Sequence, residues 1–247
     1  MRNFARNMRR YLVITAFGML LLASCSETKY VADGDLLLDK VKVKSDVKER
    51  SINTTELKSY VRQRGNSRWF SLIKVPLYTY SLSGRDTTRW LNRTLRSIGE
   101  APQLYDSLLT RQSAARLRDN LQNMGYLRAT VDVGQKVKGK KLRTTYYLHP
   151  GQRYKIRHVH YDIQDTLIAR LLNTADSTTW GLHSGMTFSA DNLDNERKRI
   201  VTELTQNGYY RFNKDFISYK ADSVAGTQWI DLTLVLHRRN QIGRAHV

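Results

Sequence analysis

Histidines are the first residues to examine for chemistry, because a neutral imidazole binds metals and exchanges protons near neutral pH. His158 and His160 lie two positions apart in an alternating segment, so they share one face of a predicted strand, and Asp162 continues that face. They form either a metal-binding pair or a pair of half-exposed sheet histidines. No cysteine or carboxylate lies at convincing ligand spacing, so we favour the second interpretation and expect no metal site and no cofactor. The full set of histidines is His149, His158, His160, His183, His237 and His246.

Serine nucleophiles and phosphate-binding loops are also missing from the sequence pattern. Ser83-Gly84 and Ser184-Gly185 resemble turns, since neither follows an apolar strand in a Gly-x-Ser-x-Gly frame. No glycine-rich phosphate-binding motif is present. We therefore expect that the protein is not an enzyme.

Cys25, the only cysteine, follows a segment typical of an export signal. The chain opens with four arginines and an apolar run from Tyr11 to Leu22. That run is shorter than the roughly 20 residues that span a bilayer, but it suits the core of a signal peptide. Leu22-Ala23-Ser24-Cys25 resembles a bacterial lipobox, so we expect a signal peptide at 1–24, lipidation at Cys25 and a tether at 25–35. The alternative is a buried thiol in a core helix.

The charge of the chain is strongly positive, at +19. Without the signal peptide and the last seven residues it is +14, because these two segments carry five arginines and no acidic residue. A positive field attracts anionic partners such as lipid head groups, although solvated basic faces would give the same composition. Export argues against nucleic acid as a partner.

Two Gly-Tyr steps divide the chain into similar parts. Gly125-Tyr126 and Gly208-Tyr209 each follow an amphipathic segment and precede an alternating one. Glycine adopts the left-handed conformation that commonly ends a helix, so each step predicts a helix stop that leads directly into a strand. Two such stops, each followed by a pair of strands, indicate a duplicated module.

Hydrophobic periodicity predicts an α+β fold, with the order β-α-α-β-β in tandem and two helices on a three-stranded sheet in each domain. We expect one domain at 36–150 and another at 151–240. Strands are expected near 37–44, 127–133, 142–148, 154–163, 216–219 and 230–236. Helices are expected at 54–64, capped by Asn53, at 87–98, capped by Asp86, near 109–124, at 166–173, and after Ser189 or Asp191.

The first domain contains an aromatic insertion at 65–86. Its aromatic side chains include Trp69, Phe70, Tyr78 and Tyr80. They either enlarge the core or form a docking patch for a partner or a membrane, since exposed apolar clusters usually mark contacts. Lys74 and Arg85 beside them would suit anionic lipid.

The order of elements and the Gly-Tyr stops resemble the POTRA (polypeptide-transport-associated) domains that precede the membrane barrel in the BamA/TamA family of outer-membrane assembly proteins. The resemblance covers about residues 36–240 and is strongest at 186–217, where Glu196-Arg197 and Gly208-Tyr209-Tyr210 resemble the family pattern; 98–133 is similar. The insertion and the lipobox resemble a lipoprotein-type subgroup.

The resemblance implies a periplasmic arm that binds unfolded outer-membrane proteins or assembly-complex subunits by β-strand augmentation. In the family, the strand after the Gly-Tyr stop lies at a sheet edge and pairs with a strand of another chain. Carried onto this sequence, the augmenting edges would contain Leu127, Ala129, Val131, Phe216 and Ser218. The resemblance also implies an outer-membrane location, with a lipid anchor and domains facing the periplasm.

The last residues, 241–247, follow a predicted strand without a turn or cap and resemble a translated sequencing adapter. We expect them to be non-native and a membrane barrel to follow in the native gene. The alternative is a complete lipoprotein adaptor without a barrel, which would scaffold an envelope complex.

Overall fold

The structure is a computed structural model that describes residues 27–69, 73–174 and 181–237. The predicted signal peptide, Cys25, Phe70 and the tail at 241–247 lie outside these ranges. Within them, no helix combines the length and the apolar composition needed to cross a bilayer.

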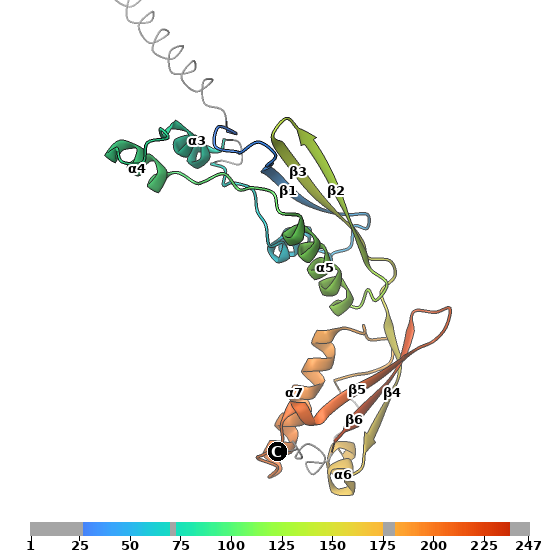
Figure 1. Cartoon of the computed structure of the whole chain (residues 1–247). Helices are drawn as coiled ribbons and strands as arrows, with labels where there is room; N and C mark the ends of the chain where they lie inside the picture. The colour runs from blue at the N-terminus through green and yellow to red at the C-terminus, as the bar shows by residue number, and fades with distance from the viewer. Residues whose placement is uncertain (1–26, 70–72, 175–180, 238–247) are drawn as a thin grey trace, which may run out of the picture. The chain divides into compact units, whose positions relative to one another are not determined.

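The described chain divides into two compact units, each with a three-stranded sheet and helices (Figure 1). The predicted α+β class and the two three-stranded sheets are confirmed. The first unit consists of the residues up to Lys44, Glu49–Ala115 and Asp132–Tyr147. The second unit consists of Ser45–Lys48, Arg116–Val131 and the chain from Leu148. The Tyr154 amide donates to Gly125 O at 2.9 Å, which ties the segment after the first Gly-Tyr stop to the second unit. The single boundary at 150 remains a prediction.

The first sheet has the order β1-β3-β2. Its strands are β1 (Leu37–Ser45), β2 (Thr130–Lys138) and β3 (Lys141–His149), and β2 and β3 are joined by a tight turn at Gly139, whose φ is +58°. The helix α5 (Ser107–Asn123) precedes β2. On β3, alternate residues are buried, as expected for a strand with one core-facing side.

The predicted helix at 54–64 is shorter than expected. The Asn53 carboxamide oxygen accepts hydrogen bonds from the Thr55 and Glu56 amides, so the predicted cap is present. However, α2 (Thr54–Leu57) gives way to a 3₁₀ turn, η1 (Lys58–Tyr60), and Val61 is extended. Ser113 Oγ accepts from the Arg62 amide at 3.0 Å, which satisfies outside the helix a backbone group that a longer helix would have used.

The aromatic insertion contains the helix α3 (Val75–Leu82), followed by α4 (Trp90–Ile98). The prediction that Asp86 caps a helix starting at Thr87 was wrong. Asp86 accepts from the Thr88 amide and hydroxyl in a local turn, and α4 begins three residues later, without a side-chain cap. The two helices pack on each other (Figure 1).

The segment expected to be a tether is packed against the first unit from Glu27 onwards. Val31 is buried with Leu37 and Leu77 in a small apolar cluster. The Tyr30 hydroxyl donates to the Ser83 carbonyl oxygen. The described part of residues 25–35 therefore belongs to the fold.

Two carboxylates beside this cluster are surrounded by four cations. Asp39 accepts from Lys74 Nζ at 2.6 Å, from Arg143 Nε at 2.7 Å and from Arg68 at 2.9 Å. Lys74, which is only 2% exposed, also lies 3.0 Å from Glu27, as does Lys141. The ion pairs with Asp39 and Glu27 compensate for the burial of the Lys74 ammonium, which would otherwise be costly.

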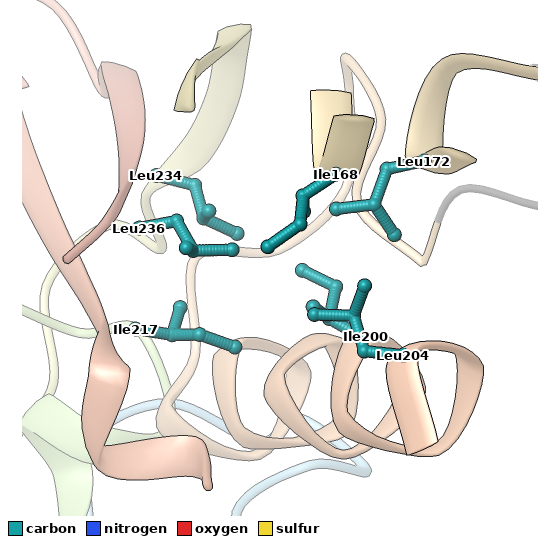
Figure 2. Close-up of a cluster of buried hydrophobic side chains, with 7 residues drawn as sticks. All are labelled: Ile168, Leu172, Ile200, Leu204, Ile217, Leu234 and Leu236. Atoms are coloured by element: carbon teal, nitrogen blue, oxygen red, sulfur yellow. The ribbon is translucent and has the colours of Figure 1, made fainter. Parts of the chain in front are cut away.

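The second unit follows the predicted order without an insertion. Its sheet is β4-β6-β5, with β4 (Lys155–Ile163) parallel to β6 (Trp229–Leu236) and β5 (Ile217–Ser223) antiparallel to β6. Its helices are α6 (Thr166–Thr174), capped by Asp165, and α7 (Ala190–Gln206), capped by Ser189. Figure 2 shows the core between the sheet and the helices, formed by Ile168, Leu172, Ile200, Leu204, Ile217, Leu234 and Leu236.

We expect the first unit to lose stability in acid through Asp39. Burial raises the pKa of Asp39, but hydrogen bonds from Lys74 and Arg143 outweigh it and hold the pKa at about 2. Because the folded pKa lies below the ordinary value of 3.8, this stabilisation is present above about pH 4 and is lost as the pH falls towards about 2. Asp39→Asn should cost about 3 kcal/mol at pH 7, since it removes a partner of buried Lys74.

The measurement is hydrogen exchange of β1 and β3 amides as a function of pH. The exposed pair Lys140–Asp33 supplies the control, because Asp33→Asn removes only a solvent-screened ion pair and should have little effect on stability. An unchanged pH dependence in Asp39→Asn would contradict this account.

Candidate functional site

Both Gly-Tyr steps end a helix with the same pair of hydrogen bonds. At the end of α5, the Gly125 amide donates to Gln122 O and the Tyr126 amide to Leu121 O. At the end of α7, the Gly208 amide donates to Thr205 O and the Tyr209 amide to Leu204 O. The φ angles of Gly125 and Gly208 are +99° and +93°. This is the Schellman arrangement, in which a left-handed glycine satisfies the last carbonyls of a helix.

The chain reaches an edge strand a few residues after each stop. The expected start of a strand at Leu127 was wrong. Leu127 lies in a turn, the Ala129 amide donates to Tyr126 O, and β2 begins at Thr130, so only Val131 of the three predicted edge residues lies in it. In the second unit, Phe216 lies in the 3₁₀ turn η3 (Lys214–Phe216) and Ser218 lies in β5.

The other edge of each sheet is already paired with a short segment of the same chain. Beside β1, the Leu38 amide donates to Gln103 O and the Tyr105 amide to Leu36 O. Beside β4, Lys155 bridges to Thr187, and the Ile156 amide donates to Met186 O. Among the described residues, no segment pairs with the outer side of β2 or β5. The edges after the Gly-Tyr stops are thus the open ones.

The register of β5 shows which of its backbone groups face outward. Phe216 O accepts from the His237 amide and the Val224 amide donates to Trp229 O, so even-numbered residues pair with β6. In an antiparallel ladder the intervening residues direct their N–H and C=O groups to the opposite side. The residues with outward-facing groups are Ile217, Tyr219, Ala221 and Ser223. Ser218 thus lies in the predicted edge strand and Phe216 just before it, but the backbone groups of both residues face β6. Augmentation at this edge stays a prediction.

A buried carboxylate holds α7 against the sheet that carries this edge. Glu196, with 0% exposure, accepts from Arg199 at 2.9 and 2.8 Å, from the Tyr161 hydroxyl at 3.1 Å and from the Gly181 amide at 2.9 Å. The Tyr219 hydroxyl on β5 donates to Leu193 O on α7 at 2.9 Å. These bonds fix the position of the open edge.

The electrostatics agree with this structural role. Burial, followed by the nearby charge of Glu196, raises the pKa values of Tyr161 and Tyr219, so both hydroxyls stay protonated and can donate. Hydrogen bonding to Glu196 also raises the pKa of Arg199. Sequence reasoning noted Glu196 only as part of a family pattern; a carboxylate at a core-facing position of α7 was the available signal.

A cavity of about 660 Å³ lies at the start of β5. Its lining includes Tyr209, Phe212, Phe216 and Leu236, with Asp165 and His237 among the polar residues. It therefore lies beside the Gly-Tyr stop and at one end of the open edge. A side chain of a strand paired with β5 could occupy it.

The other predicted site residues are not brought together into one site. Of the predicted docking patch, Trp69 is exposed, the Tyr78 hydroxyl donates to Glu27, and Tyr80 packs edge-on against Tyr30. Phe70 lies outside the described residues, and the patch stays a prediction. His158 lies 3.1 Å from Asp231. Among the described residues, no group of three or more histidine, cysteine or carboxylate side chains could hold a metal. Hydrogen bonding to Arg157, and then to His158, lowers the pKa of Asp231 to about 2.

The two stop glycines should respond differently to alanine. At either position, alanine must adopt a left-handed conformation, which costs about 1–2 kcal/mol. A Cβ at Gly208 meets nothing within 4 Å, but one at Gly125 would lie 2.6 Å from Phe188 O. We expect Gly125→Ala to lower the free energy of unfolding by about 2 kcal/mol more than Gly208→Ala, measured by urea denaturation. Equal effects would show that the close approach at Gly125 is unimportant.

Glu196→Gln should destabilise the second unit by about 3 kcal/mol, because it leaves buried hydrogen-bonding groups and Arg199 without their anionic partner. Urea denaturation followed by the fluorescence of Trp229, in a chain whose Trp69, Trp90 and Trp180 are replaced by phenylalanine, measures the effect. Asp194→Asn is the matched control on α7: its ion pair with Lys198 lies near the surface and is screened by solvent, so its loss should cost much less than the loss of Glu196. If Glu196→Gln lowered the free energy of unfolding as little as Asp194→Asn does, Glu196 would not hold α7 against the sheet as described.

No family model matches the sequence, and no curated protein matches it. Solved structures do resemble the chain. BamA from Haemophilus ducreyi lacking POTRA domains 1–3 is 14% identical, with a TM-score of 0.41, over 82% of this chain and 29% of that one. POTRA domains 3–5 of Haemophilus influenzae BamA are 12% identical, with a TM-score of 0.35, over 85% of this chain and 100% of that one.

POTRA domains 1–3 of the periplasmic domain of Omp85 from Anabaena are 10% identical, with a TM-score of 0.27, over 86% of this chain and 99% of that one. The chain thus spans less than a third of the H. ducreyi BamA structure but nearly the whole of the two POTRA structures. Two of these three structures are POTRA domains, one set from BamA and one from Omp85, and the third is a BamA that lacks POTRA domains 1–3.

Proposed function

We propose that this chain is the periplasmic binding arm of an Omp85-type outer-membrane assembly factor and that it binds clients or partner subunits by adding their strand to an open sheet edge. The supporting observation is that, in the part of the chain that the structure describes, the edge after each Gly-Tyr stop has no pairing segment, whereas the other edge of each sheet is covered. Exposed edge strands are ready templates for pairing with another chain, and most proteins block them.

The second unit offers the better-defined edge. Four residues of β5 direct both an N–H and a C=O group away from β6, which is enough for a strand of seven or eight residues to pair. Because the bonds come from the backbone, they suit clients of many sequences, and unfolded outer-membrane proteins share alternation rather than a common motif. The cavity at the start of β5 would then favour a bulky apolar side chain at one position.

The lipid anchor at Cys25 is part of the proposal and would hold the arm at the membrane. The high positive charge would favour anionic partners. We assign the chain no catalytic role and no cofactor.

Strand addition should give a pattern of hydrogen exchange with a period of two. The probe is a ten-residue peptide with alternating valine and threonine, added to the full chain. The outward amides of Ile217, Tyr219, Ala221 and Ser223 should gain protection, whereas the intervening amides are protected already by β6. Uniform protection, or protection only around the cavity, would mean side-chain docking instead.

Proline substitutions test the same edge with a matched pair. Ala221→Pro removes an outward N–H and leaves the ladder with β6 intact, so it should weaken peptide affinity about 3- to 10-fold with little loss of stability. Lys220→Pro removes an N–H that faces β6 and should mainly destabilise the second unit. Calorimetric titration and urea denaturation separate the two effects; unchanged affinity in Ala221→Pro argues against pairing at β5.

A further inference from the structure

The apolar side of the helix α4 faces solvent, and its polar side faces the rest of the unit. An amphipathic helix of a soluble protein normally buries its apolar side. On α4, Trp90, Leu91 and Ile98 are 72%, 52% and 69% exposed, and none of its residues is buried. They fall within about 100° on a helical wheel, so they form one apolar strip.

The polar side of α4 makes the contacts with the rest of the unit. Asn92 accepts from the Gly84 amide at 2.8 Å and donates to Asp86 O at 2.6 Å. Arg96 donates to Ser83 Oγ at 3.2 Å and to Gly84 O at 3.0 Å, and its guanidinium lies 5.4 Å from the Tyr30 ring. These specific bonds fix the orientation of the helix, so the outward apolar strip is built into the fold.

The charges around the strip are those that a membrane surface attracts. Residues 84–95 contain Arg85, Arg89 and Arg93 but only one acidic residue, Asp86. Arg96 is not counted with them, because it is held by the inward bonds to Ser83 and Gly84. An apolar strip with a tryptophan, flanked by arginines, is typical of helices that lie in the interface of a bilayer with anionic lipid.

The packing of the N-terminal segment brings the proposed lipid anchor to the same place. Glu27, which contacts Lys74 and the α3 residue Tyr78, is only two positions after Cys25. Two residues reach at most about 7 Å. Lys29 and Tyr30 bond to carbonyls of Ser81 and Ser83, at the end of α3 that leads to α4. A lipid on Cys25 would thus be attached within about 7 Å of a residue that contacts α3, the helix that packs on α4.

We propose that α4 is an interfacial membrane-binding helix, whose Trp90, Leu91 and Ile98 enter a phospholipid bilayer beside the lipid anchor while the neighbouring arginines contact anionic head groups. The inference uses the proposed anchor but is independent of strand augmentation. It gives the exposed apolar strip an occupant of stated chemistry and makes the first unit a two-point membrane attachment.

The test measures the depth of Trp90 in a bilayer. In the full chain, Trp69, Trp180 and Trp229 are replaced by phenylalanine, so that Trp90 is the single reporter; a second variant keeps only Trp229, in the second unit. The purified protein is reconstituted into vesicles of phosphatidylcholine and phosphatidylglycerol, with brominated phosphatidylcholine as quencher. Mass spectrometry reports acylation of Cys25 separately, so failure of the anchor is distinguished from failure of α4.

We expect brominated lipid to reduce Trp90 fluorescence about twofold and to leave Trp229 fluorescence nearly unchanged. The double variant Leu91→Gln, Ile98→Gln should lose the Trp90 quenching while the acylated protein stays on the vesicles. Leu167→Gln, at a comparably exposed leucine of α6, is the control. In this variant brominated lipid should quench Trp90 fluorescence as in the unsubstituted protein.

Two results would overturn the proposal. Trp90 that is open to acrylamide and unquenched by brominated lipid would show that the strip stays in water. Trp90 that is shielded from acrylamide but unquenched by lipid would show that a protein surface or a second copy covers it.

Discussion

Backbone amides and carbonyls that leave water must find partners, and this requirement explains most of the arrangement of the two sheets. A three-stranded sheet has two edges. In each unit the chain satisfies the outer edge of its first strand itself, with residues 103–105 beside β1 and 185–188 beside β4. The helix stop then sends the chain into the strand at the opposite edge. In the described part of each unit, one sheet edge is therefore paired by the chain itself, and the edge after the helix stop is left unpaired.

Buried charge contributes in a different way to each unit. In the first, Asp39 and Glu27 share Lys74 and draw the insertion, the first strand and the N-terminal segment together. In the second, Glu196 binds a loop amide, a tyrosine of β4 and an arginine of its own helix. Apolar residues of similar size could stabilise such positions equally well. The charged groups join segments that are distant in sequence, because each buried charge must be paired.

The fold class, the two sheets and the Asn53 cap could be predicted from sequence, because alternation, helical stripes and capping residues act locally. The covering segments could not, since 103–105 and 185–188 are too short to show a period. From the sequence, Asp39 looks like an ordinary polar residue of a strand. Its ion pair with Lys74, which is distant in sequence, is visible only in the structure. The pattern of α4 shows that one side is apolar, but only the bonds of Asn92 and Arg96 show that this side faces outward. In the second unit, the edge strand could be predicted but its register could not. The pairing of β5 with β6 decides which residues direct their backbone N–H and C=O groups outward.

The ion pair between Asp39 and Arg143 joins residues 104 positions apart, and this separation has a consequence for biogenesis. A chain that emerges N-terminus first presents β1 long before β3 can pair with it, and such non-local contacts form slowly. Until β3 arrives, β1 exposes backbone N–H and C=O groups that another chain can pair with. The folding of the first unit therefore depends on keeping this strand free of such pairing until the sheet closes.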